Sequence, residues 1–189
     1  MEWTKEDKKY LLEFRKDLDS DDIKLKDEVK QRLLSNKYIM HVLNNKHLED
    51  EDATPNDYYG INILPYFLIP DTQTEVNNYI CYETMWQNSY ANKVDKLQQI
   101  VFYILCEVKT CMDKETSLPR HDLLAALIER EFNFTELSCG RLQIESSKPS
   151  VTDNNFATRT IVFQCKTDKN LVKTINGVPT IINKKMYNG

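Results

Sequence analysis

The sequence predicts an α+β fold, in which helices back a largely antiparallel sheet of about four to five strands. Three observations lead to this class. Apolar residues recur at helical spacing in the first third, β-prone runs follow from Ile61 onward, and one leucine-rich helix interrupts those runs. A chain of 189 residues holds one hydrophobic core with an appendage. We therefore expect a helical segment over 1–50, an α+β core over 51–169 and a C-terminal β-hairpin extension over 170–189.

The first third of the chain carries three amphipathic patterns. Apolar residues at helical spacing predict helices over 5–18, 25–34 and 38–43. The acidic run over 49–59 contains proline and asparagine but no apolar period, so it predicts a loop. This loop separates the helical segment from the strands.

Three β-prone runs come next. Residues 61–69 predict a strand that Pro65 places at an edge or at a bulge. Residues 79–85 alternate between two faces, as a half-buried strand does. Residues 100–108 are almost continuously apolar, which is typical of a strand covered on both faces at the centre of a sheet.

The second half of the core combines one helix with two strands. Residues 117–132 predict a helix with Pro119 in its first turn and a leucine-rich apolar face. Residues 139–146 and 157–166 predict two strands that pair antiparallel, with Pro149 in the polar loop between them.

A hairpin is predicted at the C-terminus. Asn176-Gly177 lies between two β-prone arms, and Asn-Gly accepts the positive φ angles of a type I′ turn. We expect the apolar side chains of this hairpin to pack on another chain rather than on their own core; these candidate interface residues are Ile175, Val178 and Ile181.

Composition excludes several classes of protein. No apolar run approaches the roughly 20 residues of a membrane-spanning helix, and the N-terminus is charged where a signal peptide turns apolar. With only 4 glycines, the sequence offers no Gly-rich phosphate loop. The 5 cysteines form no CxxC pair and the 3 histidines are scattered, so neither a disulfide framework nor a zinc site is expected. We expect no cofactor, no metal and no catalysis.

The net charge of −4 is unevenly distributed. Only the tail from residue 166 onward is basic, with 5 lysines against 1 acidic residue. The body therefore lacks the electrostatic footprint of a protein that wraps nucleic acid.

One alternative is a Mg²⁺-dependent nuclease. Asp71 follows a proline, and Glu107 and Lys109 form a Glu-x-Lys triplet at the end of a predicted strand. The two carboxylates are hard oxygen ligands for Mg²⁺, and the lysine could orient an attacking water. Such triplets also arise by chance in a chain with 29% charged residues, and solvation of a strand end explains this one more simply.

A second alternative is thiol chemistry at Cys111 and His121, because a nearby imidazole can generate a thiolate. Neither surrounding sequence matches a nucleophile elbow or a cysteine-protease signature. The simpler interpretation places both residues at ordinary positions, one at a strand edge and one at a helix start.

Four aromatic residues next to polar loops are candidate interface anchors. They are Tyr58, Tyr59, Trp86 and Tyr90. Half-buried packing at the rim of the core explains them equally well.

The order and texture of residues 26–169 resemble the tail terminator (tail completion) family of long-tailed bacteriophages. The resemblance is carried by an N-terminal helix and a strand pair, followed by the elements Ile100 to Val108, Pro119 to Phe132, Gly140 to Ile144 and Arg159 to Cys165. The segment Leu64 to Glu75 also looks like phage neck proteins.

The resemblance implies a structural virion protein of the neck. Such proteins form a homo-oligomeric ring, typically a hexamer, that caps the tail tube and joins it to the head-completion or connector protein. DNA passes through the lumen without specific binding, which suits an acidic body. Subunits could join by strand addition at sheet edges. Residues 1–25 and 170–189 do not map onto the family, so a head-closure or adaptor protein is the alternative within the class of neck proteins. An alternative from a different class is a regulatory module of the host cytoplasm that binds a partner through its N-terminal helices.

Overall fold

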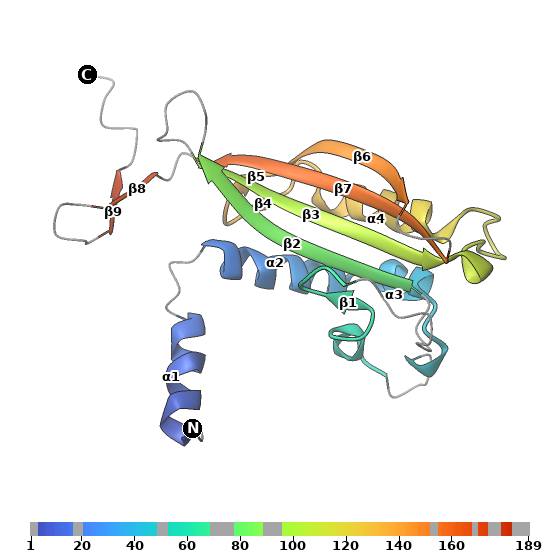
Figure 1. Ribbon diagram of the computed structural model, residues 1–189, viewed down its shortest axis with the longest axis horizontal. Helices are drawn as coiled ribbons and strands as arrows, with labels where there is room; N and C mark the ends of the chain where they lie inside the picture. Colours follow the sequence, from blue (N-terminus) through green and yellow to red (C-terminus); the bar gives the residue numbers. More distant parts are fainter. Residues whose placement is uncertain are drawn as a thin grey trace.

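A five-stranded sheet with helices on one face forms the body of the protein (Figure 1). The computed structural model describes residues 4–16, 21–48, 53–68, 78–88, 96–151, 155–167, 170–173 and 179–182. The helices are α1 (Lys5–Lys16), α2 (Asp21–Ser35), α3 (Lys37–Leu43) and α4 (Arg120–Phe132). The strands of the main sheet are β1 (Ile63–Leu64), β2 (Asn78–Asn88), β3 (Lys96–Glu107), β6 (Gln143–Val151) and β7 (Phe156–Thr167). Among the described helices, none has the length and apolarity to cross a membrane.

The strand order of the sheet is β1-β2-β3-β7-β6. Every neighbouring pair is antiparallel except β1 with β2, which is parallel and joins only two residue pairs. The predicted α+β class is confirmed. The apolar run over 100–108 lies in β3, the middle strand, as its continuous hydrophobicity predicts.

Helices α2, α3 and α4 cover one face of the sheet and enclose the main core (Figure 1). Four fully buried aromatic residues fill its centre: Tyr82, Phe102, Phe132 and Phe163. The Phe102 ring lies 5.1 Å from that of Phe132 and 5.9 Å from that of Phe163, which joins α4 to the two central strands. Such tilted and edge-on contacts stabilise a core beyond the area they bury.

A chain of buried asparagines fastens β1 and β2 to the end of α3. Asn45 donates to the Asn62 side chain at 2.7 Å, and Asn62 donates to the Asn78 carbonyl at 2.9 Å. The Asn78 side chain in turn donates to the Leu43 carbonyl at 2.8 Å. Because buried amides are costly without partners, these bonds fix where β2 starts relative to the helices.

The small elements complete the fold. They are the 3₁₀ turns η1 (Lys46–Leu48), η2 (Pro55–Tyr58) and η3 (Val108–Thr110), the pair β4 (Glu136–Leu137) and β5 (Gly140–Arg141), and the pair β8 (Asn170–Lys173) and β9 (Pro179–Ile182). Figure 1 shows β8 and β9 standing apart from the main sheet. α1 also stands apart from the body in this view.

Two sequence predictions about strands were wrong. The expected strand over 61–69 is reduced to the two residues of β1, because a turn precedes it and Pro65 follows it. Pro149, expected in a loop, pairs with Arg159 inside β6. β6 is the edge strand, where a missing N–H faces away from the ladder and proline is tolerated.

One turn also differs from expectation. Residues 55–58, expected as part of a loop, form η2, which begins with a capping box between Thr54 and Asp57. In the C-terminal hairpin the two arms pair antiparallel, from Asn170 with Ile182 to Lys173 with Pro179. The predicted type I′ turn at Asn176-Gly177 lies outside the described residues.

Candidate functional site

The first candidate surface is the side of the sheet that faces away from α2, α3 and α4, which we call the outer face. Strand alternation directs the odd-numbered residues of β3 and the even-numbered residues of β7 to this side. Part of it carries a small second core, in which Tyr103 packs against Leu64, Tyr79, Cys81, Leu105 and Phe156. The remainder is open among the described residues, since no described helix covers it (Figure 1).

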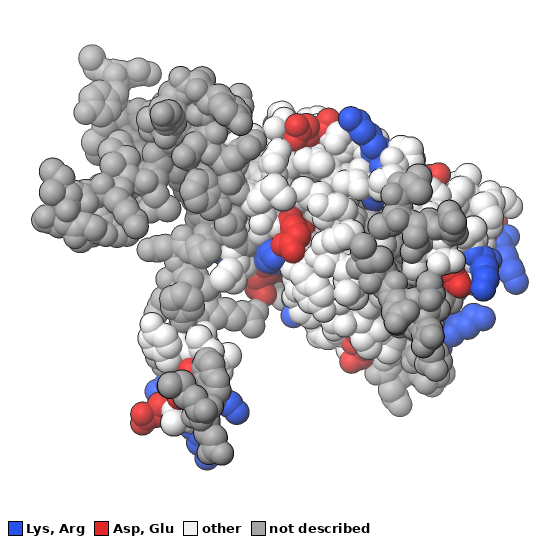
Figure 2. All heavy atoms as spheres, in the orientation of Figure 1, with Lys and Arg blue, Asp and Glu red and all other residues white. Residues whose placement is uncertain are grey.

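The open part of the outer face is largely uncharged. The half-buried Val162 pairs there with Val101, which is itself buried, and Gln99 donates to the Glu145 carboxylate at 3.0 Å. In Figure 2 the middle of the visible surface is mostly white, and blue and red atoms gather mainly toward its margins. A neutral sheet face of this kind suits contact with another protein better than contact with a charged ligand.

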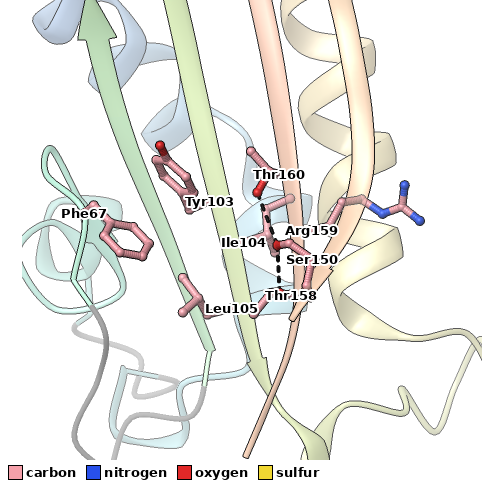
Figure 3. Close-up of a pocket in the computed structure, with 8 residues that line it drawn as sticks. All are labelled: Phe67, Tyr103, Ile104, Leu105, Ser150, Thr158, Arg159 and Thr160. Carbon is pink, nitrogen blue, oxygen red and sulfur yellow. Dashed lines mark hydrogen bonds between the residues drawn. The ribbon is translucent and has the colours of Figure 1, made fainter. Parts of the chain in front are cut away.

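A hollow of about 200 Å³ opens on the outer face beside the loop that follows β1 (Figure 3). Phe67 from this loop packs against Tyr103 with ring centroids 4.6 Å apart and ring planes tilted by 56°. On the opposite wall, the Ser150 hydroxyl lies 2.9 Å from the Thr158 hydroxyl and 3.3 Å from that of Thr160. The lining residues are Phe67, Tyr103, Ile104, Leu105, Ser150, Thr158, Arg159 and Thr160.

The hollow has the chemistry of a contact site. Its Arg159 side chain turns away toward α4, where its guanidinium binds the Asp122 carboxylate at 2.8 Å (Figure 3). Apolar rings and hydroxyls remain, and the volume suits a single protruding side chain rather than a cofactor. None of the described lining residues is a carboxylate, a histidine or a cysteine.

Phe67, which lines this hollow, is the middle one of three large exposed apolar residues in succession. Tyr66, Phe67 and Leu68 keep exposed fractions of 49%, 43% and 40%. Exposed apolar residues are ordinary singly, but a contiguous group marks an interaction surface. The run was assigned to a strand in the sequence analysis, and its signal was the apolar segment directly after Pro65.

The β6 edge of the sheet is poorly suited to strand addition. The ladder between β6 and β7 shifts register between Ile144 and Ser146, and Lys148 and Pro149 follow on the same edge. A bulge, an exposed lysine and a proline are the features that natural proteins use to block pairing with another strand. Strand addition is therefore disfavoured at the β6 edge.

The predicted aromatic anchors lie in different environments. Tyr58 is buried with only 7% of its surface exposed, and its hydroxyl donates to the Leu48 carbonyl at 3.4 Å, so little of it remains for a partner. Tyr59 is half-buried beneath Lys30, whose ammonium lies 4.1 Å from the ring centre. Trp86 lies in β2, but its side chain is outside the described residues.

The other interface candidates are not tested by the described structure. Tyr90, Ile175 and Val178 lie outside the described residues, and Ile181 is placed in β9 by its backbone alone. The expectation that the hairpin packs on another chain therefore stays a prediction.

The nuclease triad is only partly placed. Asp71 lies outside the described residues. Glu107 ends β3, with its carboxylate 3.4 Å from the Thr110 hydroxyl, and Lys109 lies in η3. Within the described ranges, no group of three or more His, Cys, Asp or Glu side chains is arranged to hold a metal ion.

The thiol pair is brought together. The Cys111 thiol lies 3.2 Å from Nδ1 of His121. The connection between them folds back on itself, since Met112 and Pro119 form an isolated bridge and the Arg120 amide donates to the Cys111 carbonyl at 2.7 Å. Ten residues of sequence separation therefore become a direct contact.

A buried arginine holds this segment on the body. Arg120 donates to the Val42 carbonyl at 3.1 Å and to the Thr110 carbonyl at 3.2 Å, and it forms an ion pair with Asp113 at 2.8 Å. Hydrogen bonds from Thr116, together with Arg120, lower the pKa of the Asp113 carboxyl. The sequence analysis missed this pair, whose signal was a charged residue directly after the helix-opening Pro119.

Fold and surface together define a protein with a one-sided sheet, an open uncharged face and no assembled metal centre in the part of the chain that is described. The chain belongs to the YomW family, whose family model matches residues 36–165. That family takes its name from a gene product of the Bacillus phage SPBc2, so the chain is related to a phage protein. Among the curated proteins, none matches the chain.

Proposed function

We propose that this chain is a structural protein of the phage neck, which forms a ring that terminates the tail tube and joins it to the head connector. The observation that supports the proposal most directly is the largely uncharged outer face of the sheet, which no described helix covers, in a chain whose family has a phage-derived name. A surface of this kind is costly in an isolated subunit and useful in an assembly.

A closed ring needs two different surfaces on each subunit, one that gives and one that receives. The exposed run Tyr66, Phe67 and Leu68 supplies an apolar protrusion, and the part of the outer face around the half-buried Val162 supplies a flat acceptor. Both surfaces lie on the outer face of the sheet. The helices α2 and α4 pack on the opposite face and would take no part in these contacts.

The charge distribution supports a conduit that DNA crosses without being held. The chain carries a net charge of −4, and tight binding of phosphates by a basic lumen would oppose passage of the DNA. In this proposal the partners are further copies of the chain, the tail tube protein and the head-completion protein, and no cofactor takes part.

The assembly proposal is tested by a charge placed on the outer face. Val162→Lys puts an ammonium beside Val101, where subunit contact would bury it unpaired. Ala126→Lys is the matched control, because Ala126 is exposed on α4. Mass photometry and negative-stain electron microscopy should show rings for the wild type and the control and single subunits for Val162→Lys, with equal circular dichroism for all three. Rings that persist in Val162→Lys would exclude the outer face as the contact.

Binding partners separate the terminator from a head-closure or adaptor protein. A terminator binds the open end of a polymerised tail tube and stops its growth, whereas a head-closure protein binds the connector and leaves tube growth unchanged. Tube length measured with and without the purified chain distinguishes the two.

A further inference from the structure

We propose that Cys111 is a nucleophilic thiol that exchanges with small disulfides, with His121 as the group that accepts its proton. The proposal concerns a modification site on the body of the protein. It does not depend on the proposed role in the neck.

The geometry places an acceptor directly at the thiol. With Sγ of Cys111 3.2 Å from Nδ1 of His121, the thiol donates to the ring in the tautomer that carries its proton on Nε2. That Nε2 lies 3.4 Å from Oδ1 of Asp122. The carboxylate is held in turn by Arg159, whose Nε lies 2.9 Å and Nη2 2.8 Å from the same oxygen. Each ring nitrogen therefore faces a group that suits this tautomer.

The imidazole is a neutral acceptor, and its lowered pKa makes it a weaker base than a free histidine. Burial lowers the pKa of His121. The Asp122 carboxylate raises this pKa and the Arg159 guanidinium lowers it, so that the net effect is a lowered pKa. A lowered pKa keeps the ring neutral near pH 7, so its Nδ1 lone pair is available. When the proton arrives, the Asp122 carboxylate stabilises the imidazolium.

The other four cysteines lack this arrangement in the described part of the chain. Burial raises the pKa of Cys81 to about 11 and also raises that of Cys106. Cys165 donates to the Cys139 carbonyl at 2.8 Å, and the hydrogen bond with Cys165 followed by burial raises the pKa of Cys139. Because the thiolate is the attacking species, these four thiols are poor nucleophiles in the folded protein.

Cys111 also lies closer to solvent than most of them. It is 7% exposed, whereas Cys81 and Cys106 are fully buried. The loop that it opens is a surface loop, since Met112 and Leu118 are 58% and 51% exposed. Cys111 is itself buried, so its reaction in the native protein depends on movement of this surface loop.

The exchange step balances with a small disulfide as the oxidant. The Cys111 proton moves to Nδ1 of His121 as sulfur attacks one sulfur of the reagent. The S–S bond of the reagent breaks while a new S–S bond to Cys111 forms. The other half of the reagent departs as a thiolate. It takes the proton from His121 or, where its thiol is acidic, leaves unprotonated while His121 passes the proton to water, and the protein gains a mixed disulfide.

The test uses the full-length native protein and 5,5′-dithiobis(2-nitrobenzoate), whose released thiolate is coloured. We expect one fast equivalent at pH 7, located at Cys111 by peptide mass spectrometry of the wild type, and four more only after unfolding. His121→Gln keeps a hydrogen-bonding side chain without a base and should slow the fast equivalent about tenfold or more. His41→Ala is the control, because this histidine is exposed and paired only with Glu115 at 3.7 Å.

Three results would overturn the proposal. They are the absence of a fast equivalent in the native protein, a fast equivalent that maps to another cysteine, and a rate in His121→Gln that is unchanged or higher. A higher rate would mean that the imidazole shields the thiol instead of accepting its proton. The wild-type mapping stands even if the variant fails to fold.

Discussion

Replacing Arg120 with methionine should destabilise the protein by about 3 kcal/mol. The guanidinium is 8% exposed and makes three contacts that methionine cannot replace, to the carbonyls of Val42 and Thr110 and to Asp113. The substitution leaves the Asp113 carboxylate, 6% exposed, without its counter-charge. Breaking a buried ion pair on one side typically costs about 3–5 kcal/mol, and the bonds that Thr116 donates to Asp113 place our value at the lower end.

Urea unfolding followed by far-ultraviolet circular dichroism measures this loss. For a chain of this length, about 3 kcal/mol corresponds to a fall in Tm of roughly 6–12 °C. Arg32→Met is the matched control, because Arg32 is 37% exposed in its pair with Glu131 and such pairs contribute less than about 1 kcal/mol. Equal losses in the two variants would refute the reasoning, since burial would then not decide the cost.

Three further predictions concern the same body. Asn62→Ala leaves the Asn45 amide and the Asn78 carbonyl without their bonds, so urea unfolding should show a loss of about 2 kcal/mol. Gly60→Ala should cost about 1 kcal/mol in thermal unfolding from backbone strain alone, because φ is +87° and an added Cβ meets nothing within 4 Å. The pKa of Asp113 is lowered in the folded state, so its contribution is present above its ordinary pKa near 3.9 and is lost as the pH falls through the lowered value. The stability gap between the wild type and Asp113→Asn should therefore narrow below about pH 4, and a constant gap from pH 7 to pH 3 would contradict this.

The elements with a strong period could be predicted from the sequence. The leucine-rich helical face predicts α4, and the continuous β-prone run predicts β3. In both cases the spacing of apolar residues along the chain reflects which side chains of that element are buried. The apolar run from Ile61 to Leu68 was misassigned for a physical reason. Phe67 covers Tyr103 on the outer face, so its hydrophobicity serves tertiary packing and not strand pairing. Local alternation carries no information about that contact.

The candidate sites also depend on contacts between residues that are distant in sequence, which local patterns do not predict. The meeting of Cys111 and His121 depends on the bridge between Met112 and Pro119, which closes the loop and has no marker in the sequence pattern. The burial of Tyr58 depends on the turn η2, whose capping box was present in the sequence as Thr54 and Asp57.

The central claim is that copies of this chain assemble into a ring. Its most direct test is mass photometry with negative-stain electron microscopy on the purified full-length chain, across a concentration series and with Mg²⁺ and polymerised tail tubes present. The account predicts discrete rings with a central hole, free in solution or seated on tube ends. Single subunits at every concentration, with tube ends left bare, would contradict it.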